Sequence, residues 1–376
     1  MTRLILIGPV YPYRGGISHF TSQMADKLLA EGYDLKVISF YQQYPDWLFP
    51  GISDKDTSTG RLKIEASFLL SPLNPISWYR TIKATYKFDP ALIIFPWWVT
   101  LWTPCFLFLL IGLKNFRRIF IIHNVLPHES WFLDRWLTKL VLSKADDWIL
   151  LSQSEKKKLL KLIPRIGNIS VCPHPIYSVF PRLELSQQQA LHTLGLQNFG
   201  NPVIMFFGII RAYKGLADLI QAISLLRASG CEVSLLVAGE FWEEKKTYFD
   251  LVEKLGIKSH VHFTNRYVPD NEVSILFAAS DLFVAPYRSG TQSGAVKTAL
   301  GFGKPMILTD VIADPFVQEL PELCEIVPSC RPDLLAKAIK RKLNQPPLDQ
   351  NFVQELSDKS WQALTDEIRD ILNRTR

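Results

Sequence analysis

A small-residue loop, Ser-Gly-Thr-Gln-Ser-Gly at 289–294, combines residue types and a spacing that suit anion binding. It follows the apolar run 282–285 and precedes a helix-like segment that ends near Gly303. Hydroxyls, glycines and unpaired backbone N–H groups at a helix start form an anion site, because the unpaired amides and the positive end of the helix dipole converge there. An ordinary strand-to-helix turn has the same local pattern, so the rest of the chain must decide between the two interpretations.

Polar side chains also follow an apolar run in the first half of the chain. His123, His128 and Glu129 come after the run 118–122. In open parallel sheets, ligands bind outside the carboxyl ends of the strands. We therefore expect these three side chains where chemistry takes place, although a carboxylate beside a histidine would equally anchor the loop.

Short apolar runs alternate with Gly-containing loops and helical patterns along the whole chain. The runs predict buried strands at 3–7, 34–39, 91–95, 118–122, 148–151, 169–172, 203–207, 233–237, 261–263 and 282–285. Strand, loop, helix and strand in succession are typical of a parallel sheet. The G-x-G-x-x-G spacing of the dinucleotide fingerprint is absent from the first such unit. The pattern predicts an α/β protein with doubly wound sheets.

The alternation breaks at a proline-rich stretch, 173–181, and then restarts. Two successive α/β units of similar size predict two Rossmann-like domains that face one another across a cleft. We place the first domain at 1–178 and the second at 179–348. The final segment, 349–376, has apolar residues at helical spacing and is expected to pack back on the first domain.

The composition describes a globular chain of 376 residues with a mild positive charge of +6. This charge fits an anionic ligand or an acidic membrane surface, and no long basic tract or nucleic-acid motif points to a nucleic-acid partner. The five cysteines are scattered, without a CxxC pair or a Cys/His cluster at metal-ligand spacing. We therefore expect a cytoplasmic setting and no metal site.

The uncharged span 95–113 is long enough to raise the question of a transmembrane helix. Pro96 and Pro104 interrupt it, and a second strand-like run follows at once. A buried strand-to-helix unit is the favoured interpretation. A helix that touches a membrane surface and a true span are the alternatives.

Four motifs occur in a fixed order in the two halves: Gly-Gly-Ile at 15–17, His-Asn-Val-Leu-Pro-His-Glu at 123–129, Phe-Gly-Ile-Ile-Arg-Ala-Tyr-Lys-Gly at 207–215, and the stretch 284–305. Through these four motifs the chain resembles the retaining GT-B-fold glycosyltransferases usually called family 4. The resemblance covers nearly its whole length. The resemblance implies transfer of a sugar from an NDP-sugar to an acceptor hydroxyl with retention at the anomeric carbon. It also places the acceptor side in the first domain and the donor in the second.

The resemblance assigns catalytic roles to three residues. Arg211 and Lys214 would bind the donor diphosphate and stabilise the charge that grows as it leaves. His123 would hydrogen-bond the donor sugar or support the departing phosphate. The family often has its arginine two positions earlier, at what is Ile209 here.

A wider set of residues would contact the donor, and His128 and Glu129 would lie on the acceptor side. The glycine pair would let the backbone approach the diphosphate, because glycine has no Cβ. The donor-binding set is Gly15, Gly16, Glu240, Tyr267, Val268, Thr291, Gln292, Ser293, Gly294 and Thr298.

The chain departs from the family at its E-x7-E signature, which would fall at Gly290 and Thr298. The first glutamate of that signature is associated with the transferred sugar and the second with the ribose. We expect backbone and side-chain donors of 289–294 to replace these carboxylates. A different donor requirement or a loss of activity are the alternatives.

No Asp-x-Asp metal motif is evident, so we expect Arg211, Lys214 and helix dipoles to take the place of a metal, with no cofactor besides the NDP-sugar co-substrate. The acceptor is unknown and would be a glycan or a lipid-linked molecule. A basic run at Lys156, Lys157, Lys158 and Lys161, together with Trp97, Trp98 and Trp102, would suit a peripheral position at an acidic membrane. A solvated helix face and core tryptophans explain the same residues.

Two other functions fit the same sequence. A nucleotide-sugar epimerase would share the two-domain cleft, and it would interconvert free NDP-sugars without an acceptor. A non-catalytic donor-binding protein is made credible by the missing glutamate pair, and it would bind NDP-sugars without turnover.

Overall fold

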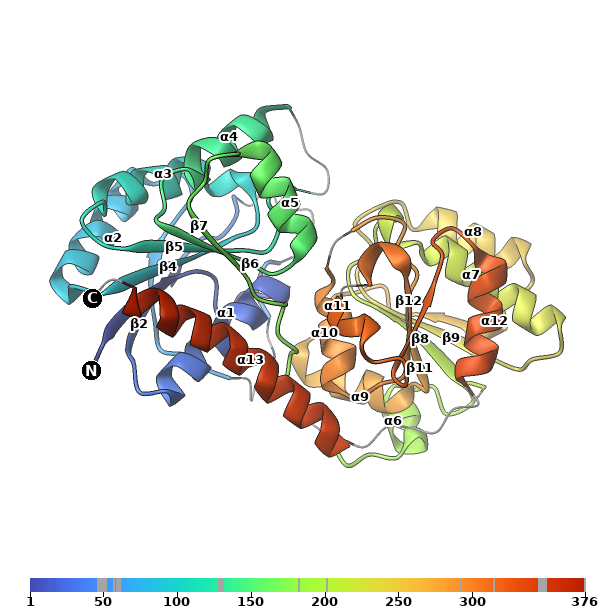
Figure 1. Ribbon diagram of the computed structural model, residues 1–376. Coiled ribbons are helices and arrows are strands. Elements are labelled where there is room, and N and C mark those ends of the chain that lie inside the picture. Colours follow the sequence, from blue (N-terminus) through green and yellow to red (C-terminus); the bar gives the residue numbers. More distant parts are fainter. Residues whose placement is uncertain are drawn as a thin grey trace. The chain divides into compact units, whose positions relative to one another are not determined.

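The computed structural model describes residues 1–45, 53–56, 58, 62–127, 132–181, 183–200, 202–290, 292–313, 315–343 and 350–374. The chain divides into two compact units (Figure 1). Unit 1 comprises Met1–Thr57, Leu62–Pro175 and Asp358–Arg376, and unit 2 comprises Ser58–Arg61 and Ile176–Ser357.

Unit 1 contains a seven-stranded parallel sheet in the order β3-β2-β1-β4-β5-β6-β7. Its elements are β1 (Arg3–Ile7), α1 (Gly16–Ala30), β2 (Asp34–Phe40), β3 (Ala66–Leu70), α2 (Pro75–Phe88), β4 (Leu92–Trp97), α3 (Thr103–Gly112), β5 (Arg118–Ile122), α4 (Phe132–Leu142), β6 (Asp147–Leu150), α5 (Gln153–Leu162) and β7 (Asn168–Val171). The last helix, α13 (Gln350–Asn373), belongs to this unit from Asp358 onward.

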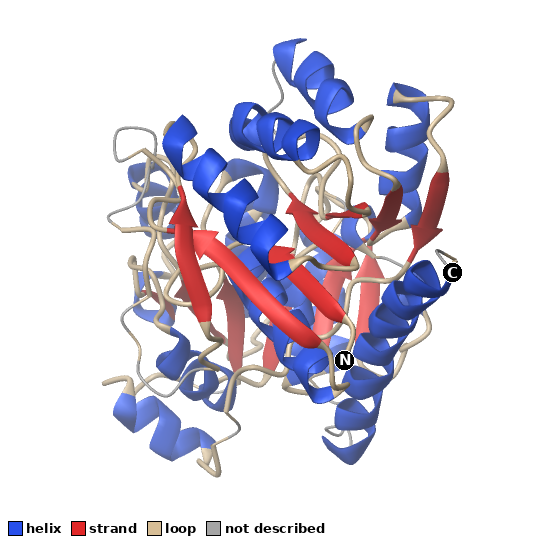
Figure 2. Cartoon of the chain, turned by 90° about the vertical axis from the view of Figure 1, so that its left-hand side faces the viewer, coloured by secondary structure: helices blue, strands red, loops and turns tan. Residues whose placement is uncertain are grey.

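Both faces of this sheet are covered by helices (Figures 1 and 2). Side chains of α3, α4 and α5 join alternate strand residues such as Phe95 and Phe120 in one apolar cluster. On the other face, Phe20 of α1 packs against Trp361 of α13 with ring centroids 5.5 Å apart. The central strands are therefore apolar on both faces, which is why they occur in the sequence as continuous runs.

Unit 2 contains a six-stranded parallel sheet in the order β10-β9-β8-β11-β12-β13. Its elements are α6 (Gln187–Thr193), β8 (Val203–Phe207), α7 (Leu216–Ala228), β9 (Ser234–Ala238), α8 (Lys246–Lys254), β10 (Val261–Phe263), α9 (Asp270–Ala279), β11 (Leu282–Ala285), α10 (Gly294–Gly301), β12 (Met306–Thr309), α11 (Pro315–Gln318), β13 (Cys324–Val327) and α12 (Pro332–Lys342). The strand order reverses direction beside β8, where ligands of doubly wound sheets bind.

The structure confirms the predicted α/β class with two doubly wound, Rossmann-like sheets. Each predicted apolar run corresponds to a strand, with ends that differ by a residue or two. The strands β3, β12 and β13 were not predicted. The segment 95–113 consists of the end of β4, a short 3₁₀ turn and α3, which is the strand-to-helix unit that the sequence favoured. Across the described parts of the chain, the helices are all too short or too polar to span a bilayer.

The tryptophans considered for membrane contact lie inside unit 1. Trp97 and Trp102 are buried. Trp98 is half-buried, and its indole N–H donates to the Tyr44 hydroxyl at 3.0 Å. A membrane surface built from these three residues is therefore wrong, because their rings pack against Phe40 and Phe106 in the core.

Candidate functional site

The loop from Gly208 to Gly215 joins β8 to α7 and contains the two predicted cations of unit 2. Ile210 forms an isolated parallel bridge with Phe241, which extends the β8–β9 pairing past the strand ends. The backbone N–H of Ala212 donates to Glu243 Oε2 at 2.6 Å, and Lys214 closes a short 3₁₀ turn. These bonds fix the loop at the carboxyl end of β8.

The ammonium of Lys214 and the first turn of α10 both border Gly208. A Cβ placed on Gly208 would be 3.3 Å from Lys214 Nζ and 3.9 Å from Ala295 Cβ. Gly208 therefore leaves the space that the ammonium occupies, next to the first turn of α10. A cation and a helix N-terminus at one place form a site for an anion.

Three hydroxyls hold the start of α10. Ser293 caps the helix by accepting from the Val296 N–H at 3.4 Å, and its Oγ lies 2.9 Å from the Tyr287 hydroxyl. Thr309 Oγ1 donates to the Tyr287 carbonyl at 2.6 Å. Among the described residues, the amides of Gly294 and Ala295 have no acceptor, so they are available to a ligand.

Burial disfavours the charge on Lys214. Burial lowers the pKa of its ammonium below the usual value, and the nearby Arg211 guanidinium lowers this pKa further, while Tyr213 acts in the opposite direction. A bound anion would reverse this effect, since an opposite charge at close range favours the protonated form.

Arg211 and Glu240 both contact Trp242. The guanidinium carbon of Arg211 is 5.0 Å from the centroid of the Trp242 ring, within cation–π range. The Trp242 N–H donates to Glu240 Oε2 at 3.1 Å. Glu240 follows the end of β9, so both predicted residues are at the carboxyl edge of the sheet.

The loop after β8 and the loop after β11 are fastened to each other. Arg288 makes a two-pronged ion pair with Asp218, with N–O distances of 2.6 and 2.8 Å, and its backbone N–H donates to the Tyr213 carbonyl at 2.7 Å. Gly215 has φ of 70°, and a Cβ there would be 1.9 Å from the Pro286 carbonyl oxygen. This close approach requires glycine, because any side chain would displace the backbone of one loop.

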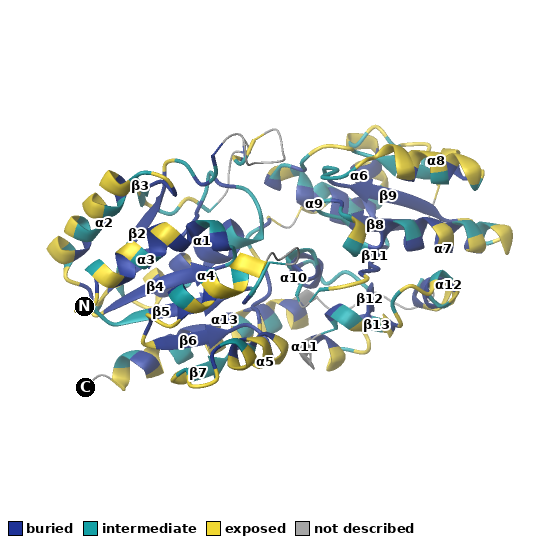
Figure 3. Cartoon of the chain, turned by 90° about the horizontal axis from the view of Figure 1, so that it is seen from above, coloured by how far each residue is buried: buried dark blue, intermediate teal, exposed yellow. Residues whose placement is uncertain are grey.

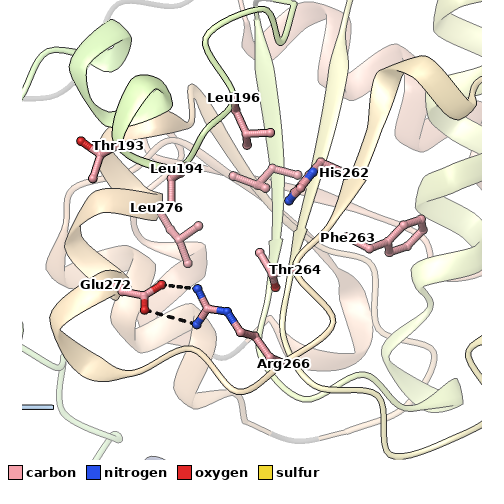
Figure 4. Close-up of a pocket in the computed structure, with 10 residues that line it drawn as sticks. Thr193, Leu194, Leu196, His262, Phe263, Thr264, Arg266, Glu272 and Leu276 are labelled. Carbon is pink, nitrogen blue, oxygen red and sulfur yellow. Dashed lines mark hydrogen bonds and ion pairs between the residues drawn. The ribbon is translucent and has the colours of Figure 1, made fainter. Parts of the chain in front are cut away.

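Tyr267 and Val268 are on the loop before α9. The Tyr267 hydroxyl bonds with Asp270 at 3.4 Å, and Val268 is buried. The preceding Arg266 pairs with Glu272 of α9, at 2.5 Å and 3.3 Å. This pair closes one end of a cavity of about 410 Å³ beside β10, α6 and α9 (Figure 4).

The predicted residues of 289–298 that the structure describes differ in their burial and in their hydrogen bonds. Thr291 lies outside the described residues, and Gln292 is half-buried and has an interaction partner. Thr298 is buried, and its hydroxyl donates to the Gly294 carbonyl at 2.9 Å within α10. Gly290 has φ of 147° and offers no side chain. No carboxylate therefore occupies either position of the family's glutamate pair.

In unit 1, the glycine pair begins α1. Gly15 is the N-cap, with φ of 99° and ψ of 169°, and Gly16 is the first helical residue. A Cβ on Gly15 would meet no atom within 4 Å. Because glycine has no side chain, the N-cap makes no side-chain hydrogen bond to the first turn of α1.

His123 comes directly after β5 and is buried among rings. Its ring lies 4.5 Å from Phe20 and 5.7 Å from His174, and among the described residues its Nε2 has no hydrogen-bond partner. Burial lowers the pKa of His123 well below its usual value, and proximity to His174 adds to this effect. The imidazole is therefore neutral at neutral pH, and it offers a hydrogen bond rather than a charge.

The sequence did not point to two carboxylates that hold these loops. Glu155 is buried on α5 and accepts from the Val125 N–H at 2.6 Å, in the segment that follows His123. Glu243 has the same function for Ala212. A Ser-x-x-Glu pattern at 152–155 marks a helix start in the sequence, but its carboxylate reaches another element.

The two units thus assemble different parts of the predicted site. Unit 2 brings Lys214 together with the start of α10, and Arg211 together with Trp242 and Glu240. Unit 1 presents His123 and, separately, the Gly15–Gly16 helix start. His128 and Glu129 lie outside the described residues. Within the described ranges, no group of three or more His, Cys, Asp or Glu side chains is arranged to hold a metal ion.

Sequence comparisons match this site region to known enzymes. Residues 201–345 match the family model described as glycosyl transferases group 1. The chain is 27% identical over 161 residues to 2-deoxystreptamine glucosyltransferase of Streptomyces kanamyceticus, covering 40% of this chain and 39% of that protein. It is 28% identical over 137 residues to mannosylfructose-phosphate synthase of Agrobacterium fabrum, covering 35% and 29%. These matches span well under half the length of either relative.

Solved structures resemble the whole chain. Sucrose-phosphate synthase from Thermosynechococcus elongatus has a TM-score of 0.73 at 17% identity, with both chains fully covered. The Anabaena protein HepE in complex with UDP-glucose has a TM-score of 0.69 at 13% identity, covering 98% of this chain and 100% of that one. At these identities the likeness concerns the fold. The chain has the GT-B fold, and its residues 201–345 match the glycosyl transferases group 1 family.

Proposed function

We propose that the chain is a retaining glycosyltransferase of family 4 that moves a sugar from an NDP-sugar to an acceptor hydroxyl. The observation that carries the proposal is the Lys214 ammonium beside the first turn of α10. A cation beside backbone amides suits the negative charge of a diphosphate, whereas the sugar and the nucleobase of a donor carry no such charge. The family match over residues 201–345, the UDP-glucose complex of the structurally similar HepE and the glucosyltransferase named among the relatives all support a nucleotide-sugar donor.

The chemistry needs charge stabilisation at the leaving group. The bond between the anomeric carbon and the phosphate oxygen breaks, a bond to the acceptor oxygen forms, and the acceptor hydroxyl loses its proton. Lys214, Arg211 and the amides at 294–295 would stabilise the diphosphate as its negative charge grows. Neutral His123 would donate or accept one hydrogen bond toward the sugar. With these groups we expect activity without a metal.

The direct test combines donor binding with product analysis. NDP-sugars, beginning with UDP-glucose, are screened by thermal shift, because a ligand of the native state raises its apparent stability. The donors that bind are then incubated with glycan and lipid-linked acceptors in the presence of EDTA. We expect NDP release coupled to a new glycosidic bond with the donor's anomeric configuration, read by NMR. Interconversion of free NDP-sugars without an acceptor would show an epimerase instead.

A non-catalytic donor-binding protein is the second candidate, and one observation favours it. The family's glutamate pair is replaced by Gly290 and by Thr298, whose hydroxyl is engaged within its own helix. Donor binding without turnover across the acceptor panel would establish this alternative. Synthesis of a polysaccharide, a glycolipid or a related glycoconjugate is the setting that we propose for the transferase.

A further inference from the structure

Helix α2 of unit 1 has large apolar side chains on two sides: Trp78, Ile82 and Phe88 pack against the core, whereas Ile76, Tyr79 and Tyr86 are exposed. Its buried positions are Ser77, Thr81 and Thr85, whose hydroxyls donate to carbonyls one turn earlier in the chain. Apart from Pro75 at its start, its exposed positions form one stripe, made of Ile76, Tyr79, Arg80, Lys83, Tyr86 and Lys87. A surface helix of a globular protein normally buries its apolar side. Ile76, Tyr79 and Tyr86 therefore leave apolar surface on the outer stripe, which indicates a partner for it.

Helices α3 and α4 continue this surface. The rings of Trp78 and Phe108 lie 5.5 Å apart, and Gly112 of α3 approaches α2 so closely that a Cβ there would be 2.3 Å from Ile82 Cδ1. The two helices therefore form a tightly packed platform. Figure 3 shows exposed positions on α2, α3 and α4, all on one side of the sheet in Figure 1.

The exposed apolar side chains on these helices are large. Phe132 of α4 is 79% exposed and Trp136 is 62% exposed, while α3 exposes Phe108 and Ile111. Single exposed apolar residues are common, but a cluster over three adjacent helices marks an interaction surface.

The charges on this surface have one sign. Its exposed cations are Arg80, Lys83, Lys87, Arg135 and Lys139, with Lys114 just past the end of α3. Asp89, just past the end of α2, is paired with Arg3. Helices α2 and α3 contain no acidic residue. The carboxylate of α4, Asp134, is half-buried and accepts from the Thr100 hydroxyl. A partner of this surface must therefore be both anionic and apolar.

We propose that the surface formed by α2, α3 and α4, called here the outer helix face, binds a bilayer that contains anionic lipids. Aromatic and aliphatic side chains enter the boundary between headgroups and acyl chains, and Lys and Arg approach the lipid phosphates. A second copy of the chain fits less well, because a two-fold interface would bring six cations against six. An acidic protein would pair the cations but would not require so many exposed rings.

This proposal does not depend on the proposed transferase activity, since vesicle binding is measured without donor or acceptor. The purified chain is floated with phosphatidylcholine vesicles and with vesicles that contain about a quarter phosphatidylglycerol, at low and high salt. We expect flotation with the anionic vesicles, weakened by salt, and little with the neutral ones.

Two double variants separate the apolar and the charged contributions. Phe132→Ser with Trp136→Ser removes the most exposed rings, and we expect it to abolish flotation. Lys83→Gln with Lys87→Gln removes two cations and should lower the partition coefficient about 30-fold, at roughly 1 kcal/mol per cation near an anionic surface. The matched control is Lys157→Gln with Lys161→Gln on α5, which removes the same charge from exposed positions outside the outer helix face.

The outcomes decide the proposal. Circular dichroism and the midpoint of thermal unfolding, both measured without ligand, establish that each variant is folded. Absence of flotation at low salt would overturn the proposal, as would equal losses in the α5 control. Sedimentation is measured alongside, and a dimer that dissociates only in the Phe132/Trp136 variant would show that a second copy covers this surface instead.

Discussion

The two Rossmann-like units place groups of different electrostatic character at the carboxyl ends of their strands. Unit 2 presents Lys214 near the start of α10 and Arg211 over the Trp242 ring, whereas unit 1 presents His123, which is buried and neutral among rings. In both units a carboxylate, Glu243 or Glu155, holds the adjoining loop by its backbone N–H. The loops are thus fixed in the same way, and the side chain that each presents determines the role of the unit. Unit 2 is suited to hold an anion, and unit 1 to offer a hydrogen bond.

The largest effect on stability is expected at Gly215 of unit 2, in comparison with Gly15 of unit 1. Gly215→Ala places a Cβ 1.9 Å from the Pro286 oxygen at positive φ, and overpacking together with left-handed strain should cost about 2–5 kcal/mol. Gly15→Ala meets no atom and should cost about 1–3 kcal/mol of backbone strain alone. Hydrogen exchange of the backbone amides of β8 and α7 measures the destabilisation by Gly215→Ala.

Gly256→Ala is the matched control in unit 2, because Gly256 also has positive φ but has no atom near its Cβ position. Equal destabilisation by Gly215→Ala and Gly256→Ala would show that the close approach to Pro286 is unimportant.

Loss of the unit 2 cation should weaken nucleotide binding next most strongly. Lys214→Ala removes a charge-assisted contact to the diphosphate, worth about 1.5–3 kcal/mol, and should raise the Kd for UDP about 10- to 100-fold in calorimetry. In the wild type, affinity should also fall as pH rises through the lowered pKa of Lys214, because deprotonation removes the cation. Lys254→Ala, an exposed lysine on α8, serves as the control. An unchanged Kd for UDP in Lys214→Ala would show that the Lys214 ammonium does not bind the nucleotide.

The unit 1 histidine should appear in the pH dependence of stability. His123 has a lowered pKa in the folded chain, so the unfolded chain binds its proton first and stability falls as pH drops below about 6.5. Between pH 7 and 5, His123→Gln should reduce this loss by about 2 kcal/mol in urea unfolding. The control is His192→Gln, at an exposed position of α6. Identical pH slopes for wild type and His123→Gln would contradict a buried neutral imidazole.

The smallest effect is expected at Thr298. Its hydroxyl bonds to the Gly294 carbonyl in the same helix, so Thr298→Val should change the Kd for UDP by less than about twofold. A loss of tenfold or more would mean that the hydroxyl turns to the ligand, and it would restore a direct donor contact at the family's second glutamate position.

The strands could be predicted from the sequence where apolar runs are continuous. Strands that are buried on both faces occur as such runs, without alternating polar residues. The sequence pattern missed β3, a short strand with an exposed Phe68, because it is only partly buried. It also offered Trp97, Trp98 and Trp102 as residues for membrane contact. Trp97 and Trp102 instead fill the core, while α2, which the sequence did not single out, exposes the rings of Tyr79 and Tyr86. Residue spacing alone does not tell which stripe of a helix faces inward.

The candidate site shows the same limit. Lys214 was predicted from its place after a strand, but its neighbour at the start of α10 is far away in the sequence. Glu155 and Glu243 lie in charged segments that resemble solvated helix and loop surfaces, and their partners are about 30 residues away. Only the fold brings such pairs together.

A crystal structure of the chain with UDP tests the central claim most directly. The account predicts the diphosphate within hydrogen-bonding distance, about 3 Å, of Lys214 Nζ and of the amides at 294–295. A nucleotide whose phosphates contact neither Lys214 nor the segment 290–294 would contradict it.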